Sequence, residues 1–203
     1  MRVKVCGITR AEDAVLAADL GAVALGFNFW PGSPRYVTPV RARDIVAQLP
    51  PFVVAVGVFV NQPLDAVLSI ARLARLGAVQ LHGDERPEDY GSLPVRVIKA
   101  VSLRSATDVD AADAVPDRAM VLLDAHDPVG RGGTGRTIDW TLAASISRRR
   151  PIVLAGGLHA GNVADAIAAV DPYGVDVSSG VECGPGTKDP AKLRAFFAAV
   201  GAL

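Results

Sequence analysis

The chain has 203 residues, half of them hydrophobic, and its 21 basic side chains balance its 21 acidic ones, so the formal net charge is zero. This length fits one domain of ordinary size, with a core large enough to need no crosslinks. The balanced charge lacks the basic excess of nucleic-acid-binding proteins, so we expect no nucleic-acid partner.

Short apolar runs alternate with amphipathic segments along the whole chain. Most of the runs are β-branched or continuously apolar, which is typical of parallel strands that are covered on both faces. In chain order, we expect strands at Val3–Cys6, Val23–Phe27, Val53–Val60, Val79–Leu81, Val95–Val101, Met120–Leu123, Ile152–Ala155 and Val175–Val177.

Helix start signals lie in the segments between these runs. Thr9 and Glu12 have the spacing of a capping box. Thr38 and Asp189 each precede a proline, which predicts a helix with an N-cap residue followed by proline at its first position. Three further helices have a candidate N-cap in Asn61, Asp139 and Asn162.

Eight such units, of about 25 residues each, predict the fold class. Strands that alternate with helices form βαβ units, which leaves a closed barrel or an open, doubly wound sheet. No linker or change in composition divides the chain, and eight similar units favour closure. We therefore expect an α/β protein with a single (β/α)8 TIM barrel over residues 1–203. In that fold the active site lies in the loops after the strands.

Small residues follow the last two expected strands. Gly156 and Gly157 come after the seventh strand, and Ser178, Ser179 and Gly180 come after the eighth. Such loops expose backbone N–H groups, and barrel enzymes often bind a substrate phosphate at these two strands. Two tight turns that need glycine would explain the same residues, but their position favours a phosphate site.

Two chemically active side chains end strands elsewhere on the rim. Cys6 ends the first strand, and its thiol can act as a general base if nearby dipoles or cations lower its pKa. A lone cysteine is more often inert packing. Asp124 ends the sixth strand, where its carboxyl group could donate a proton or merely cap a loop. Together, a base and an acid across the barrel mouth suit proton transfer on a sugar phosphate without a cofactor.

Arg35 lies in a proline-stiffened loop after the second strand. A fixed guanidinium suits bidentate recognition of a carboxylate, although a surface salt bridge would also account for it. The three histidines, His82, His126 and His159, have no metal-ligand spacing, so we expect no metal.

The segment Gly130–Gly135 matches the dinucleotide fingerprint G-x-G-x-x-G by letter. That fingerprint requires its glycines directly after a strand, whereas Ala125–Val129 intervene here. We interpret the glycine-rich loop as a lid over the site.

The cysteines and the apolar runs bear on the compartment. Cys6 and Cys183 lie far apart, which fits neither a disulfide framework nor a metal-binding pair. No apolar run approaches the roughly 18 residues of a membrane helix. Charged residues such as Arg10 and Glu12 stand where a signal peptide would need an apolar stretch. We therefore expect a soluble, cytoplasmic protein with no membrane partner.

At these residues the chain resembles the phosphoribosylanthranilate isomerase family of tryptophan biosynthesis. The matching segments occur in order, near successive strand ends, and extend over nearly the whole chain. They are Lys4–Thr9, Ser33–Val37, Val56–Asn61, Val79–Glu85, Leu122–Asp124, Gly132–Gly135, Asp139–Trp140, Leu154–Leu158 and Val175–Glu182.

The resemblance implies a cofactor-free Amadori rearrangement of N-(5′-phosphoribosyl)anthranilate. By position, Asp124 would be the general acid that assists opening of the furanose ring, and Cys6 the general base that removes the C2′ proton. Arg35 would hold the anthranilate carboxylate. The other expected substrate-binding residues are His82, Gly133, Gly156, Gly157, Asp176, Ser178, Ser179 and Gly180. The implied partner is thus a small-molecule substrate, and we expect a monomer.

Two other interpretations share parts of this pattern. A pentose-phosphate epimerase or an indole-glycerol-phosphate synthase would use the same phosphate site. The first usually needs metal-binding histidines at several strand ends, and the second needs a lysine acid, for which Lys99 is the one candidate. A non-catalytic barrel that binds a phosphorylated ligand would have no use for an opposed Cys6 and Asp124.

Overall fold

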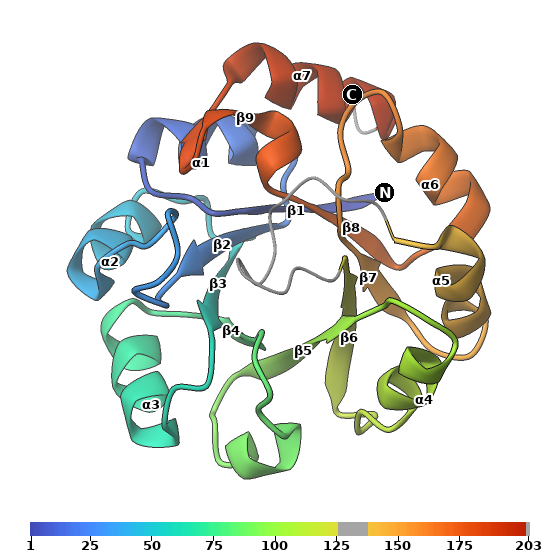
Figure 1. The fold of residues 1–203 in the computed structure, drawn as a ribbon. Helices are drawn as coiled ribbons and strands as arrows, with labels where there is room; N and C mark the ends of the chain where they lie inside the picture. The colour runs from blue at the N-terminus through green and yellow to red at the C-terminus, as the bar shows by residue number, and fades with distance from the viewer. Residues whose placement is uncertain (126–137, 202–203) are drawn as a thin grey trace.

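The computed structural model describes residues 1–125 and 138–201 and contains one closed barrel of eight parallel strands (Figure 1). The strands are hydrogen-bonded in chain order, and the last pairs with the first. They are β1 (Arg2–Cys6), β2 (Ala24–Asn28), β3 (Val54–Phe59), β4 (Ala78–Leu81), β5 (Arg96–Ser102), β6 (Ala119–Asp124), β7 (Ile152–Leu154) and β8 (Gly174–Val177). The predicted (β/α)8 barrel is confirmed, and each predicted strand end differs from the observed one by no more than one residue.

Helices form a ring around the strands, and α1 lies beside α7, so the two ends of the chain meet in that ring (Figure 1). The helices are α1 (Ala11–Asp19), α2 (Pro39–Val46), α3 (Leu64–Leu73), α4 (Thr107–Asp113), α5 (Trp140–Ser147), α6 (Val163–Val170) and α7 (Pro190–Ala199). The fourth unit departs from the pattern, because β4 is followed only by the short 3-10 helix η1 (Pro87–Tyr90). After β8 come the 3-10 helix η2 (Ser179–Val181) and a small hairpin of β9 (Glu182–Gly184) and β10 (Thr187–Lys188).

Three predicted helix starts are confirmed. Thr38, Asp139 and Asp189 each accept a hydrogen bond from a first-turn amide, at α2, α5 and α7 respectively. Pro39 and Pro190 occupy the first helical positions, where a missing N–H removes no hydrogen bond.

The other predicted N-caps do not form. Thr9 and Glu12 make no capping box, because α1 begins after Arg10 and the Thr9 hydroxyl donates to a backbone carbonyl of the β9–β10 hairpin. Asn61 has a positive φ of 54° in the loop before α3, and its side chain bonds to the loop after β4 instead. Asn162 occupies the N-cap position of α6 without capping it. The side chains of Thr9 and Asn61 thus bind distant loops, whereas that of Asn162 bonds to Gly157 and His159 in its own loop.

The apolar core divides into two parts because successive side chains of a strand point to opposite faces. Most buried residues fill the space between the barrel and the helices, as Val3 and Val5 of β1 do with Phe196 of α7. A separate, small cluster, which contains Ala100 and Leu122, packs on the inner face of β5, β6 and β7. The inner face of β1, β4 and β8 instead carries the buried polar residues Lys4, Gln80 and Asp176. A polar site can therefore form on this side of the barrel interior.

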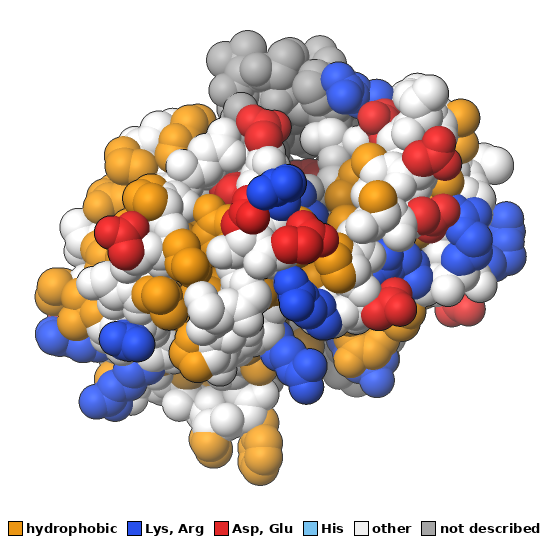
Figure 2. All heavy atoms as spheres, turned by 90° about the horizontal axis from the view of Figure 1, so that it is seen from below, with side chains coloured by type: hydrophobic (Ala, Val, Ile, Leu, Met, Phe, Trp, Pro, Cys, Tyr) orange, Lys and Arg blue, Asp and Glu red, His pale blue; other side chains and the backbone are white. Residues whose placement is uncertain are grey.

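The surface and the helices bear on possible partners. On the side of the barrel at the lower edge of Figure 1, basic and acidic side chains are interspersed (Figure 2). This face therefore has no continuous basic patch. Within residues 1–125 and 138–201, no helix is both long and apolar enough to cross a membrane.

Candidate active site

Strand periodicity brings polar side chains to the inner face of the barrel. Lys4 and Cys6 share that face of β1, and Gln80 shares it with His82, which directly follows β4. Asp176 of β8 pairs in register with Lys4, so these two charged side chains lie side by side. The polar groups therefore converge at the carboxyl ends of β1, β4 and β8.

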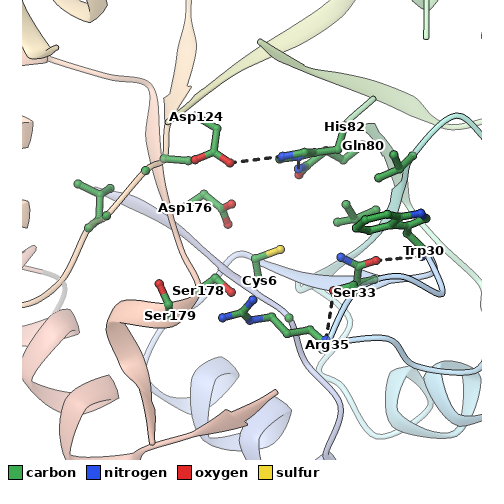
Figure 3. A pocket seen from close by; sticks show the side chains of 18 residues that line it. Cys6, Trp30, Ser33, Arg35, Gln80, His82, Asp124, Asp176, Ser178 and Ser179 are labelled. Carbon is green, nitrogen blue, oxygen red and sulfur yellow. Dashed lines mark hydrogen bonds and ion pairs between the residues drawn. The ribbon is translucent and has the colours of Figure 1, made fainter. Parts of the chain in front are cut away.

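One cavity at these strand ends brings most of the predicted site residues together (Figure 3). Its lining includes Cys6, Arg35, His82, Asp124, Gly156, Gly157, Asp176, Ser178 and Ser179. Gly180 is next to them in η2 but does not line the cavity. Gly133 and the loop interpreted as a lid lie outside the described residues.

Several further wall residues were not among the expected site residues. They are Gly7, Asn28, Trp30, Ser33, Val58, Val60, Gln80, Ala155 and Leu158. One of them carried a signal: Gln80 interrupts a short, fully buried strand, and a buried amide needs a partner. For the residues of the loop after β2 the signal was only their place after a strand, because their exact positions depend on the path of that loop.

The thiol of Cys6 occupies a narrow space beside β2. The β1–β2 register pairs Cys6 with Gly26, where an added Cβ would lie 2.7 Å from Sγ. Burial raises the pKa of the Cys6 thiol above its ordinary value, although the ammonium groups of Lys4 and Lys188 act to lower it. The nearby cations therefore do not lower this pKa overall, because desolvation outweighs them.

Asp176 and Lys4 form a buried ion pair on the floor of the cavity. Lys4 Nζ lies 2.9 Å from Asp176 Oδ1, and both side chains are nearly inaccessible to solvent. Burial acts to lower the pKa of Lys4, but the Asp176 carboxylate more than compensates and holds it above its usual range. Figure 3 shows Asp176 between Cys6 and Asp124. Its charge is thus balanced within the protein rather than left for a ligand.

The guanidinium of Arg35 lines the cavity, but one of its edges is hydrogen-bonded to another side chain of the protein. Its Nε and Nη2 bond to the carboxylate of Glu182 at 3.0 and 2.7 Å. Burial alone would raise the pKa of Glu182, but the hydrogen bond from Arg35 and the nearby Lys188 lower it below its ordinary value. The bidentate edge expected for a ligand is therefore occupied, and Nη1 donates to no described residue.

Lys188 ties together the ends of β1 and β8. Its side chain is completely buried, and Nζ donates to the backbone carbonyls of Cys6 and Ser178 at 2.5 and 3.3 Å. Nζ also bonds to Glu182 at 2.8 Å. Burial lowers the pKa of Lys188, and the Glu182 carboxylate counteracts this. The strand ends that carry Cys6 and the serine loop are thus held at a fixed separation.

Asp124 lies across the cavity from Arg35, where one backbone amide and the His82 imidazole lie next to its carboxyl group (Figure 3). The backbone N–H of Ala125 donates to Oδ1 at 2.8 Å, and His82 Nε2 lies 3.3 Å from Oδ2. On its other side, His82 Nδ1 lies 2.8 Å from Gln80 Nε2. These contacts hold the carboxyl group of Asp124 toward the cavity.

The backbones of the loop after β7 and of the loop after β8 pack closely against each other. Gly156 and Gly157 have φ values of 85° and 63°, which favour glycine. An added Cβ on Gly180 would lie 2.0 Å from the carbonyl oxygen of Leu158, so glycine lets the two loops meet. The backbone N–H groups of Gly157, Ser179 and Gly180 donate to no acceptor among the described residues. Such groups suit an anion.

A metal centre has no counterpart in the part of the chain that is described. Within residues 1–125 and 138–201, no group of three or more histidine, cysteine and acidic side chains could hold a metal ion. Lys99, the candidate lysine acid, does not line this cavity; its Nζ donates to the carbonyl of Gly83 at 2.5 Å and lies 3.6 Å from Glu85.

Comparisons with known proteins agree with this geometry. A family model described as N-(5′phosphoribosyl)anthranilate (PRA) isomerase matches residues 3–199. A relative from Pelobacter propionicus with the name N-(5′-phosphoribosyl)anthranilate isomerase is 50% identical over 197 residues, which cover 97% of this chain and 94% of the relative. A relative of the same name from Geobacter metallireducens is 50% identical and covers 97% of each chain.

Solved structures of the same name have the same fold. The phosphoribosyl anthranilate isomerase of Thermus thermophilus is 44% identical, with a TM-score of 0.90 and coverage of 100% and 99%. The enzyme of Thermotoga maritima is 42% identical, with a TM-score of 0.91 and full coverage of both chains. Because the match extends over almost the whole of every chain, the chain belongs to the N-(5′-phosphoribosyl)anthranilate isomerase family.

Proposed function

We propose that Cys6 and Asp124 are the general base and the general acid of the isomerisation of N-(5′-phosphoribosyl)anthranilate, a step of tryptophan biosynthesis. The single observation that carries this proposal is that a thiol and a carboxyl group face one cavity in a chain of this family. A related structure, 40% identical with a TM-score of 0.87, is a complex with reduced 1-(o-carboxyphenylamino)-1-deoxyribulose 5-phosphate. That ligand supports the same substrate class here.

In the first step, Asp124 acts as an acid. Its carboxyl group gives a proton to the ring oxygen of the ribose, the C1′–O bond breaks, and C1′ becomes part of an iminium ion with the anthranilate nitrogen. The carboxylate left behind is stabilised by the hydrogen bond from Ala125 N and by the imidazole of His82, whose Nε2 lies 3.3 Å from Oδ2. A positioned acid of this kind typically contributes about 10²- to 10⁴-fold to the rate.

In the second step, Cys6 acts as a base. Its thiolate removes the proton from C2′, the electron pair of that bond forms the C1′=C2′ double bond, and the iminium nitrogen becomes neutral. The resulting enolamine gains a proton at C1′ and loses one from the C2′ hydroxyl, which yields the ketone. The oxidation at C2′ balances the reduction at C1′, so the rearrangement needs no external oxidant or reductant. This step requires the thiolate form of Cys6. Burial favours the neutral thiol, whereas the nearby ammonium groups of Lys4 and Lys188 favour the thiolate.

The ends of the substrate fit the two sides of the cavity. Nη1 of Arg35 would donate a hydrogen bond to the anthranilate carboxylate. This contact is end-on and replaces the bidentate contact that was expected from the sequence. The unpaired backbone N–H groups of Gly157, Ser179 and Gly180 would receive the phosphate at the opposite side. Ser178 and Ser179 line the cavity there and add hydroxyl donors.

One chain supplies every residue of this proposed site, so a monomer suffices for the reaction. A related enzyme from Thermotoga maritima is described as dimeric. Sedimentation velocity would decide between the two states for this protein. The cytoplasm is the proposed compartment, because Cys6 and Cys183 are free thiols and the second is exposed.

The proposal is tested by growth of a tryptophan auxotroph that lacks this isomerase. The parent chain should restore growth without tryptophan, whereas Cys6→Ala and Asp124→Ala should not. Matched controls are Cys183→Ala and Asp117→Ala, which remove an exposed thiol and an exposed carboxylate and should restore growth. Failure of the parent, with soluble protein in the cell, would contradict the function. Growth with both site variants would contradict the two roles.

A further inference from the structure

We propose that Gln80 is a positioning residue that fixes the tautomer of His82, so that His82 Nε2–H donates to Asp124. This inference rests on the proposed function, because it gives the contact a role in the acid step. Gln80 itself does not contact Asp124 and would act on it through His82. Both lie on the inner face of β4 or directly after it, beside the group that must give up a proton.

The direction of the hydrogen bonds follows from the amide group. An amide nitrogen can only donate, and Gln80 Nε2 lies 2.8 Å from His82 Nδ1. Nδ1 must therefore accept, and a neutral imidazole then carries its proton on Nε2. Nε2 lies 3.3 Å from Asp124 Oδ2, within ion-pair distance, so a proton on Nε2 lies next to that carboxyl group. The three side chains form one chain of donors from Gln80 to Asp124.

This tautomer favours the reaction at the moment when Asp124 loses its proton. With Nε2 protonated, the new carboxylate accepts one hydrogen bond at Oδ2 from His82 and one at Oδ1 from Ala125 N. In the opposite tautomer, the lone pair of Nε2 would face the carboxylate and repel it. Gln80 thus makes Asp124 a more effective acid through the tautomer of His82.

The buried amide oxygen of Gln80 supports this role. Gln80 is 1% exposed, and its Oε1 accepts no hydrogen bond from any residue that the structure describes. An unpartnered buried acceptor is unfavourable. A methionine of similar size would avoid that cost, so packing alone does not explain an amide at this place. The donor on the same amide does explain it, because it sets the tautomer of His82.

The direct test is nitrogen NMR of the imidazole rings in the intact protein without ligand, at a pH at which the rings are neutral. The chain has three histidines, and His82→Asn identifies the signals of His82 by their loss. In the parent protein, Nε2 of His82 should give the signal of a protonated nitrogen and Nδ1 that of an unprotonated one. The opposite assignment would overturn the inference.

Two variants at Gln80 then distinguish the effect of its amide N–H donor from the effect of its side-chain volume. Gln80→Glu presents an acceptor, so Nδ1 should become protonated, and kcat should fall about 10- to 100-fold as the stabilisation of the Asp124 carboxylate is lost. Gln80→Met presents neither donor nor acceptor, so both tautomers should be populated, with a smaller fall in kcat. KM should change less than about twofold in both, because the substrate contacts remain.

Gln62 provides a matched control. Its amide oxygen is also buried and unpartnered among the described residues, and its nitrogen donates to the Phe29 carbonyl at 3.2 Å. It does not line the cavity, so Gln62→Met should leave the His82 signals and kcat as in the parent.

The outcomes separate the inference from the proposed function. A Gln80→Glu protein with the reversed tautomer and parental kcat would overturn the positioning role. If Gln80→Glu does not fold, the parent spectrum and Gln80→Met decide the question. A parent with no isomerase turnover would overturn the proposed function and the kinetic role with it, whereas the parent spectrum would still test the hydrogen bond.

Discussion

The guanidinium of Arg35 has two edges with different partners. Glu182 holds Nε and Nη2, and this contact both orients the side chain and neutralises it in part. What remains for a ligand is Nη1, which donates to no described residue. The residue that sequence patterns mark as a carboxylate binder is therefore fixed by a carboxylate of the protein before any substrate arrives.

Arg35→Met should weaken binding of the anthranilate end of the substrate selectively. Loss of one charge-assisted hydrogen bond, about 1.5 to 3 kcal/mol, corresponds to a fall of about 10- to 100-fold in kcat/KM. Inhibition by free anthranilate should weaken in parallel, whereas inhibition by inorganic phosphate should not change. The exposed Arg72 on α3 gives the matched control, Arg72→Met, which should behave as the parent. Unchanged anthranilate inhibition in Arg35→Met would remove the role from Arg35.

The direction in which the pKa of Cys6 shifts could not be predicted from the residues next to it in the sequence. A thiol at a strand end suggests activation, but the extent of burial decides the direction of its pKa shift, and burial depends on how other parts of the chain pack around it. Lys188 and Glu182, which shape this environment, lie in a hairpin far along the chain from Cys6. Their contribution could not be derived from any local pattern.

At the scale of elements, the sequence predicted the strands well and the helix starts unevenly. Strands in a parallel barrel are buried on both faces, so their apolar runs mark them clearly, and proline at a first helical position marks α2 and α7. Thr9 and Asn61 failed as caps because their side chains bind other loops. The absence of a full helix after β4 gave no clear signal beyond Pro87, which opens η1.

Strand register also determines which residues lie next to the site residues. Gly26 of β2, which pairs with Cys6 of β1, shows this most clearly. Gly26→Ala should displace the Cys6 thiol, because its new Cβ would lie 2.7 Å from Sγ and 3.1 Å from the Cα of Cys6. We expect kcat to fall at least about tenfold. The free energy of unfolding should fall by about 1 to 3 kcal/mol, as measured by urea denaturation.

Two controls accompany this prediction. Gly184→Ala adds a Cβ where nothing lies within 4 Å, and it should leave both quantities unchanged. In a Cys6→Ala background, the destabilisation by Gly26→Ala should be smaller, because the clash with Sγ is absent. Parental kcat in Gly26→Ala would show that the thiol is not confined as described.

For the whole molecule, barrel closure is what makes a site from distant segments. β8 pairs with β1, which places Asp176 against Lys4 across most of the length of the chain. Lys188 then bonds to the ends of both strands and to Glu182, which in turn holds Arg35. The predicted acid, base and arginine lie around one cavity, whereas the ion pairs beneath them appear only once the barrel closes. Neutral net charge is thus compatible with an anion site built from backbone amides and one arginine.

The most direct test of the account is the turnover of N-(5′-phosphoribosyl)anthranilate by purified parent, Cys6→Ala and Asp124→Asn proteins. Each substitution should lower kcat by about 10²- to 10⁴-fold, because it removes the base or the acid. Inhibition by inorganic phosphate should stay within about twofold of the parent, which would show that the cavity remains intact. Near-parental kcat in either variant would contradict the role assigned to that residue.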